Sequence, residues 1–434
     1  MNFKNQSFLL LFMGIAIAFI ALAAFTHHNN SKTVNRPISC SMPPQKACVF
    51  RTLIGVESFD TAAVKYDPRL TEAAIRNGLN WIIQAQQNNG GWGAGSHYNQ
   101  NVNDPHAVPA DPAATALVGM ALLRTADKPF EGKYAVQLKN AVNFLLKEVN
   151  NASPQSTNIT SLTNTQPQTK LGRNIDVILT AQFLSNALKY KDINAELKKE
   201  MQDALQKCIA KIQKGQDTDG GWKDGGWAPV LQSALANNAL ESVKEQGYRV
   251  DSVVLERSRN YQKNNYDTKT NSAVTGKAAG VLLYSVSSSA RASAKEAKQA
   301  KETIERAKKQ GKLKDGDKVT EDNLVKAGYT KSEAQKYATA YEIQGAAVSR
   351  AQETNVMNGF GSNGGEEFLS YLMTGESLII GGGNEWKTWF EKMSGRLVQI
   401  QNNDGSWNGH HCITSPVFCT ATCLLILSID KDVQ

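Results

Sequence analysis

Residues 93–112 (GAGSHYNQNVNDPHAVPADP) form the segment of this chain that is richest in histidine and aspartate. Within it, Asp104, His106 and Asp111 carry groups that can exchange protons near neutral pH or hydrogen-bond a substrate, and His97 lies close by in the sequence. The alternative is a polar loop in which aspartate and proline set the turns. We take Asp104, His106 and Asp111 as candidate catalytic residues and keep the structural alternative open.

Glu366 and Glu367 follow a glycine-rich turn in the segment GSNGGEEFLSYL. They could act as catalytic acids, but the helix dipole alone also favours carboxylates in the first turn of a helix. Trp227, in the segment DGGWAP, presents a similar choice between the lining of a cavity and an ordinary core position.

The elements that would position these residues are indicated by a repeated motif. A glutamine is followed six residues later by a tryptophan, with glycine between them, in QQNNGGW, QDTDGGW and QNNDGSW. Before each motif, apolar residues recur at three- and four-residue spacing, which predicts an amphipathic helix that ends at the glycine. The motif residues are Gln86 and Trp92, Gln216 and Trp222, and Gln401 and Trp407.

Smaller, more apolar segments alternate with the amphipathic ones, and each contains a threonine or serine that would serve as a helix N-cap. Six amphipathic and six apolar helices that pack in pairs can close into a double ring. In such a ring the motif glutamine would bind free N–H groups at a neighbouring helix start, and the tryptophan would stack on that glutamine and on the glycine turn. The expected starts of the apolar helices are Thr115, Thr180, Ser233, Thr275, Thr374 and Thr420.

Residues from about 288 to 340 interrupt the repeats with a segment rich in alanine, lysine and glutamate. Its pattern predicts a solvated helical hairpin with charge pairs at i,i+4 spacing, or a basic surface for a protein partner or a membrane. Much of the formal net charge of +8 comes from this segment. No nucleic-acid-binding motif accompanies the charge, so nucleic acid is not an expected partner.

The N-terminal residues 8–25 (FLLLFMGIAIAFIALAAF) contain no charged side chain. Their length just spans a bilayer core, and the small residues near position 21 also fit a signal-peptide cleavage site. We therefore interpret residues 1–26 as a membrane anchor or a signal peptide, and residues 27–69 as a linker. Either interpretation places residues 70–434 on the periplasmic or extracellular side, or in the medium if the segment is cleaved.

The chain has six cysteines, and an even number in an oxidising compartment permits disulfides. The simplest pairs by sequence are Cys40 with Cys48 and Cys412 with Cys419. Free, buried thiols are the alternative for the C-terminal group.

The three Gln–Trp motifs resemble the "QW" motifs of the terpenoid-cyclase and protein-prenyltransferase superfamily, the squalene-cyclase-like repeats. The resemblance covers residues 70–430 and implies an all-α fold, an α6/α6 toroid, with a central cavity lined by the starts of the inner helices and the loops before them. Asp104, His106 and Asp111 would then lie at the mouth of that cavity. Cyclases of this superfamily that protonate an alkene carry a DxDD motif. Here Asp111 matches its first position, but the two positions before Thr115 are alanines, and the sequence around Asp176 lacks the same acids.

The prenyltransferase branch of the superfamily holds zinc with Asp, Cys and His, which activates a thiol as its thiolate. The resemblance makes the C-terminal cluster a candidate zinc site, although the separate Asp-x-Cys element of that branch is absent. The candidate ligands are His410, His411, Cys412 and Cys419, with Asp404 nearby.

Two classes of function remain open from the sequence. The first is a membrane-anchored, non-catalytic repeat protein that binds a lipid, an isoprenoid or a protein partner in the ring. The second is an enzyme, either a terpenoid cyclase with non-standard catalytic residues or a zinc-dependent prenyl transferase. The absent acid motif favours the binding protein, because a fold alone does not give function.

Overall fold

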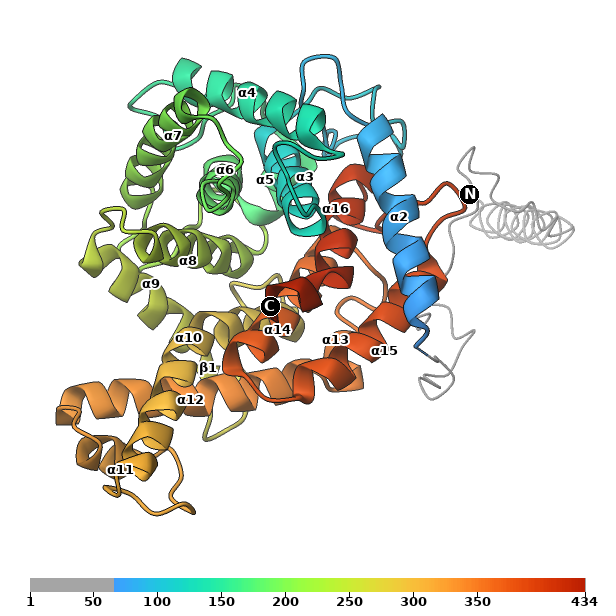
Figure 1. The fold of residues 1–434 in the computed structure, drawn as a ribbon. Helices are drawn as coiled ribbons and strands as arrows, with labels where there is room; N and C mark the ends of the chain where they lie inside the picture. The colour runs from blue at the N-terminus through green and yellow to red at the C-terminus, as the bar shows by residue number, and fades with distance from the viewer. Residues whose placement is uncertain (1–65, 434) are drawn as a thin grey trace, which may run out of the picture. The chain divides into compact units, whose positions relative to one another are not determined.

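The computed structural model describes residues 66–433, which are mostly helical (Figure 1). Six helices form an inner layer and six form an outer layer around them. The inner helices are α3 (Pro112–Thr125), α6 (Ile175–Ala187), α8 (Pro229–Glu245), α10 (Leu282–Lys309), α14 (Gly365–Gly381) and α16 (Pro416–Leu427). The outer helices are α2 (Pro68–Gln84), α4 (Ala135–Asn151), α7 (Ala195–Lys214), α9 (Ser252–Lys263), α12 (Lys331–Ala351) and α15 (Glu385–Ile400).

The inner helices contact one another in chain order, and the last of them, α16, contacts the first, α3, which closes the ring. α8 and α10 also carry polar and charged residues, but α3, α6, α14 and α16 are apolar on nearly all sides, and every residue of α16 is buried. Such a helix must be covered all round. The outer helices supply the cover: α4, α7, α9, α12 and α15 each pack on the inner helix that precedes them in the chain, and α2 packs on α16. The structure thus agrees with the prediction of an all-α, toroid-like fold.

The short elements lie in the connections between these helices, except for one that follows α16. They are α5 (Gln166–Leu171), α11 (Glu321–Lys326), α13 (Thr354–Met357), the 3-10 helix η2 (Ile429–Val433), and the strands β1 (Tyr266–Asp267) and β2 (Ser272–Ala273). The two strands pair antiparallel, with Tyr266 opposite Ala273.

The charged segment at residues 288–340 does not begin as a separate element, because α10 runs unbroken from the inner ring into it. Its outer part packs with α11 and α12 around a small apolar cluster of its own. The cluster consists of Ala300, Ile304, Ala307, Leu313, Leu324, Ala334 and Ala338. A protein partner for this segment stays a prediction.

Several predictions from the sequence fall on residues 1–65, outside the described part of the chain. They are the membrane anchor or signal peptide, most of the linker, and the Cys40–Cys48 disulfide. Among the helices of residues 66–433, none combines the length and the apolar character needed to cross a bilayer.

The three Gln–Trp motifs make the same set of hydrogen bonds in three places. The indoles of Trp92, Trp222 and Trp407 are buried. Each indole Nε1 donates to a carbonyl oxygen in the last turns of the preceding outer helix, at 2.7 to 2.8 Å. Each tryptophan backbone N–H donates at 2.9 Å to a hydroxyl of the next inner helix, on Thr115, Ser233 or Thr420.

The expectation that these hydroxyl residues are N-caps is wrong. Asp111 caps α3 and Ser415 caps α16, while Thr115 and Thr420 lie inside those helices, where their hydroxyls hold the tryptophan backbone. Thr180, Ser233 and Thr374 also lie inside helices, and Thr275 precedes α10 in a turn.

The glutamines tie each motif to the next outer helix, but through carbonyl oxygens instead of the expected N–H groups. The amide Nε2 of Gln86 donates to Gly90 O at 2.8 Å and to Gln137 O, in α4, at 3.0 Å. Gln216 does the same toward α9. These bonds use the amide N–H₂ of the glutamine, which is a donor, whereas the expected bonds would have used its oxygen, which is an acceptor.

The third motif joins the two ends of the ring. Gln401 Nε2 donates to Gly405 O at 2.8 Å and to Ala74 O, in α2, at 2.9 Å. Gly405 has φ +94°, and a Cβ there would lie 2.6 Å from Asn77 O. Gly90 and Gly220 sit equally close to the backbone of α4 and α9, so glycine at this position is a requirement of the motif.

Candidate functional site

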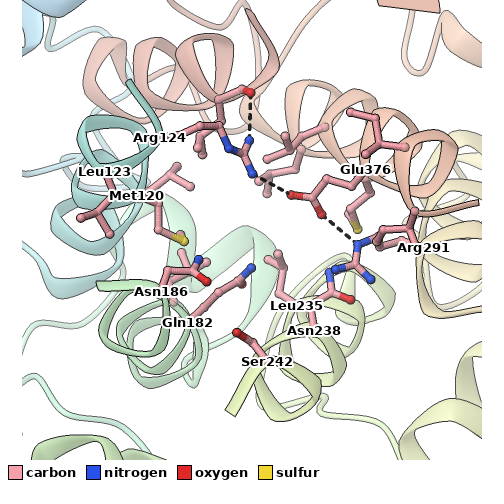
Figure 2. A pocket seen from close by; sticks show the side chains of 18 of the residues that line it. Met120, Leu123, Arg124, Gln182, Asn186, Leu235, Asn238, Ser242, Arg291 and Glu376 are labelled. Atoms are coloured by element: carbon pink, nitrogen blue, oxygen red, sulfur yellow. Dashed lines mark hydrogen bonds and ion pairs between the residues drawn. The ribbon is translucent and has the colours of Figure 1, made fainter. Parts of the chain in front are cut away.

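A cavity of about 560 Å³ lies at the centre of the ring, and all six inner helices contribute to its lining (Figure 2). This volume falls within the range of roughly 300–1,000 Å³ that is usual for small-molecule sites. The lining runs from Leu117 to Arg124 in α3 and from Leu369 to Ile380 in α14, and it includes Arg291 and Lys295 in the first half of α10; the first turns of the inner helices and the loops before them do not contribute. The expectation that helix starts and their preceding loops line the cavity is therefore wrong.

Part of the cavity wall is apolar. These side chains give a ligand a hydrocarbon surface to bury against, which is the main source of affinity for a lipid chain. They are Leu117, Met120, Leu123, Leu179, Leu235, Leu369, Leu372, Met373, Ile379, Ile380 and Leu425.

Amides and a hydroxyl from α6 and α8 line another part of the wall. Gln182 and Asn186 come from α6, and Asn238 and Ser242 from α8 (Figure 2). Gln182 Oε1 and Asn238 Oδ1 are buried and make no hydrogen bond within the described part of the chain. Buried polar atoms of this kind call for a hydrogen-bonding partner, so this wall suits the polar portion of a ligand.

An ion-pair chain runs along the cavity from α3 to α14 to α10 (Figure 2). Glu376 Oε1 lies 3.5 Å from Arg124 Nη2, and Glu376 Oε2 accepts a hydrogen bond from Arg291 Nε at 2.9 Å. Arg124 Nη1 also donates to Leu425 O at 3.0 Å. Burial raises the pKa of the Glu376 carboxyl, but Arg291 and Arg124 outweigh it and hold the pKa below its usual range. Glu376 is therefore a carboxylate.

The ion pairs continue away from the cavity between α8, α9 and α10. Glu241 lies 3.8 Å from Arg291 Nη1 and 3.1 Å from Arg259 Nη2. Arg259 in turn reaches Glu296, which also pairs with Lys263. Glu241 and Glu296 are almost fully buried. This network holds Arg291 in position from the side that faces away from the cavity.

None of the three candidate catalytic residues lines the cavity. Asp104 and His106 are exposed, and His106 Nε2 lies 3.1 Å from Gln84 O. Asp111 is buried, where its carboxylate accepts N–H bonds from Ala114 and Ala94 at 2.8 Å. Because Asp111 precedes α3 and Arg124 ends it, the rise of 1.5 Å per residue puts these two residues about 20 Å apart along the helix. The three residues are thus loop and cap residues.

Asp176, near the start of α6, is a second buried carboxyl. It accepts backbone N–H bonds from Ile159 at 2.8 Å and from Thr160 at 3.2 Å. Burial raises the pKa of Asp176 to about 7 and that of Asp111 to about 6, against the lowering effect of the N–H bonds. Both residues fix loops to helix starts.

Glu366 and Glu367 form a buried carboxyl pair at the start of α14. Tyr284 donates to Glu367 Oε1 at 2.6 Å, and His411 Nε2 lies 3.4 Å from Glu367 Oε2. Burial raises the pKa of both carboxyls, and for Glu366 the charge of Glu367 adds to the effect. The pair therefore holds a proton near neutral pH, but neither residue is among those that line the cavity.

Because these buried carboxyls have raised pKa values, we predict that the protein loses stability as the pH rises toward neutral. The pKa of Asp176 is about 7 in the folded protein and 3.8 ordinarily, so only the folded state holds its proton between those values. A raised folded pKa makes the free energy of unfolding highest at low pH. For Asp176 alone we expect a fall of about 2 kcal/mol between pH 5 and pH 7.

The measurement is urea unfolding at a series of pH values for the wild type and Asp176→Asn. The variant cannot titrate, so its stability should fall less steeply over this range. Asp203→Asn, at an exposed position on α7, is the control and should keep the wild-type slope. Parallel curves for Asp176→Asn and wild type would contradict the prediction.

The candidate zinc ligands are not brought together. No group of three or more His, Cys, Asp or Glu side chains within residues 66–433 has the arrangement of a metal site. Cys419 lies buried in α16, where its thiol contacts Ile413 O at 3.6 Å, and His411 Nε2 lies 2.9 Å from Ser362 O. His410 and Cys412 belong to the loop before α16.

The expected Cys412–Cys419 disulfide is also absent, because both residues carry free thiols. Cys412 has a left-handed backbone with φ +56° and hydrogen-bonds Lys170, whereas Cys419 is held within a helix. Burial raises the pKa of the Cys412 thiol to about 12, so it is not a thiolate nucleophile.

Trp227 neither lines the cavity nor lies in the core. Its side chain is 56% exposed, and Lys170 Nζ sits 3.4 Å from the ring centroid.

Arg124, Arg291 and Glu376 are not among the site residues predicted from the sequence. The sequence does mark two of them as unusual, because Arg124 and Glu376 are isolated charges in otherwise apolar segments, TALVGMALLRT and LSYLMTGESLII. A charge inside a buried helix is seldom found without a partner.

No protein-family model matches this sequence, and no curated protein matches it. Among solved structures, the chain is similar to the type II terpene cyclase MstE from Scytonema. A single-residue variant in complex with its product, merosterolic acid A, is 12% identical, with a TM-score of 0.42 over 84% of this chain and 98% of that chain. A second variant, in complex with the substrate geranylgeranyl dihydroxybenzoate, has a TM-score of 0.40 at 12% identity, with 84% and 99% covered. The apo form has a TM-score of 0.32 at 12% identity, with 84% and 99% covered.

Proposed function

We propose that this chain is an α6/α6 toroid that binds an amphiphilic lipid of the isoprenoid class in its central cavity and does not cyclise it by protonating an alkene. The observation that carries the proposal is the composition of the cavity wall. Leucine, methionine and isoleucine side chains share it with the Gln182 and Asn238 amides and with the ion-pair chain through Glu376. The isoprenoid class comes from the resemblance of the Gln–Trp motifs to those of isoprenoid-handling proteins.

A purely hydrocarbon ligand fits this wall poorly. It would leave Gln182 Oε1 and Asn238 Oδ1, which are already buried, without a partner, at roughly 1–3 kcal/mol for each group. An amphiphile avoids this loss, because its polar part faces the amides while its chain lies on the leucines. The cavity therefore favours a ligand with a chain and a polar head.

The acids of the structure argue against cyclisation by protonation. An alkene needs a strong, protonated acid beside it. Glu376, on the cavity wall, is held as a carboxylate by two arginines. The protonated carboxyls at Asp176, Glu366 and Glu367 lie outside the lining.

The test is the binding of geranylgeraniol to the purified chain, measured by native mass spectrometry and by calorimetry. Leu235→Trp should weaken binding at least tenfold, because the indole fills the cavity, and Met120→Trp places the same obstacle on another helix. Val136→Trp, at a position 66% exposed on α4, is the matched control and should bind like wild type. Melting temperatures establish that each variant is folded.

Two results would overturn the proposal. Equal binding by wild type and both cavity variants would place the lipid elsewhere or nowhere. Conversion of a polyprenyl substrate into a cyclic product, detected by gas chromatography with mass spectrometry, would refute the non-cyclising part.

A further inference from the structure

The ion-pair chain in the cavity has the geometry of an anion-binding site that already holds an anion. Arg124 approaches one oxygen of the Glu376 carboxylate, at 3.5 Å, and Arg291 Nε hydrogen-bonds the other, at 2.9 Å. The three side chains come from α3, α14 and α10, and Figure 2 shows them following one another along the cavity. Arginine presents planar donors that match carboxylate and phosphate groups. Glu376 thus shows which kind of group these two arginines accept.

Arg291 has donor capacity beyond Glu376. It is 7% exposed, and its Nη1 is buried without a hydrogen bond in the described part of the chain. The paired oxygen of Glu241 lies 3.8 Å away, too far for a hydrogen bond. A buried guanidinium with an unused N–H is costly unless an acceptor reaches it. Arg291 therefore keeps an unused N–H on Nη1 although its Nε is paired with Glu376.

The charge of the lining favours an anion as well. Four lining residues are basic, namely Arg124, Lys189, Arg291 and Lys295, and two are acidic, namely Glu245 and Glu376. The four positive and two negative charges leave an excess of two positive charges within the lining, and the buried Glu241, which pairs with Arg291 and Lys295, offsets one of them. A site with low-dielectric walls and one sign of charge in excess concentrates ligands of the opposite charge.

We propose that Arg124 and Arg291 form the head-group site of the cavity, that Glu376 occupies it as an internal carboxylate, and that an amphiphile with a carboxylate or phosphate head takes the place of Glu376 on the arginines. This inference rests on the proposed function, since it assumes that the chain of the amphiphile enters the cavity. Glu376 then sets selectivity: a neutral head cannot compete with it for the arginines, whereas an anionic head can.

The experiment compares three ligands that share one chain, geranylgeraniol, geranylgeranyl monophosphate and geranylgeranoic acid. Glu376→Gln removes the competing charge, so it should bind both anionic ligands at least tenfold more tightly than wild type does. Its affinity for the neutral alcohol should change less than threefold. Arg291→Met should abolish the preference for the anionic ligands over the alcohol. The phosphate and carboxylate arms show which head group the site takes.

Glu305→Gln is the matched control, because it removes the same charge at an exposed site in the outer part of α10, paired with Lys308. It should leave all three affinities within threefold of wild type. If Glu376→Gln binds the anionic ligands no better than wild type while the alcohol still binds, this inference is wrong and the proposed function stands. If none of the three ligands binds any variant, both are wrong.

Discussion

Replacing Trp407 by alanine is expected to lower the free energy of unfolding by about 3–5 kcal/mol, the range found when a buried aromatic side chain is truncated in a core. The indole is 1% exposed and sits where α2 meets α15 and α16, the last two helices of the ring. Its backbone N–H binds Thr420 of α16, and its Nε1 donates to Leu397 O of α15 at 2.8 Å. Its ring also packs on Gly78 of α2, where even an added Cβ would come within 2.8 Å of it. Alanine therefore leaves a cavity between three helices and an unpaired carbonyl.

Urea unfolding followed by circular dichroism measures this loss. Trp227→Ala makes the same chemical change at a residue 56% exposed and should cost about 1 kcal/mol or less. Trp407→Phe keeps a ring but removes the hydrogen bond to Leu397 O, so it should fall between the two, with a loss of about 1–3 kcal/mol. Equal unfolding midpoints for Trp407→Ala and Trp227→Ala would show that the third motif does not hold the ring closed.

Ring closure was predictable because its determinants are local and repeated. Glutamine, glycine and tryptophan at fixed spacing mark a helix end, and each copy makes the same bonds in the structure. The pattern could not show whether the glutamine side chain would accept a hydrogen bond through its oxygen or donate one through its N–H₂ group. In the structure each glutamine amide donates to carbonyl oxygens, one in its own glycine turn and one in the next outer helix.

The cavity could not be predicted, for a reason that lies in the inner helices themselves. An amphipathic helix shows in its sequence which face is buried, but a helix apolar all round does not show which face points to the centre of a ring. Arg124, Arg291 and Glu376 come from different inner helices and meet only after the ring closes. The resemblance placed the candidate residues Asp104, His106 and Asp111 at the mouth of the cavity, whereas none of them is among the residues that line it.

Replacing Arg259 by methionine is expected to lower the free energy of unfolding by about 3 kcal/mol, because removing one partner from a buried ion pair leaves an uncompensated charge. Arg259 lies 3.1 Å from Glu241 and 3.5 Å from Glu296, and these side chains are 1% and 5% exposed. Burial alone would raise the pKa of Glu296, but Lys263, Arg259 and Lys336 hold it below its usual range. Glu296 therefore stays charged in the variant, and both Glu296 and Glu241 lose a shared partner.

If the distance between the charged atoms alone decided the loss of stability, another ion pair would matter more than those of Arg259. The Arg173–Asp224 pair is shorter, at 2.7 Å, but its side chains are 64% and 31% exposed. Water screens that pair, so Arg173→Met should cost no more than about 1 kcal/mol. Raising the salt concentration should reduce the small effect at Arg173 and leave the effect at Arg259 nearly unchanged, since buried pairs are little screened. Equal losses for the two variants would mean that Glu241 and Glu296 are satisfied by their lysines alone, and that Arg259 does not support the network that holds Arg291 at the cavity.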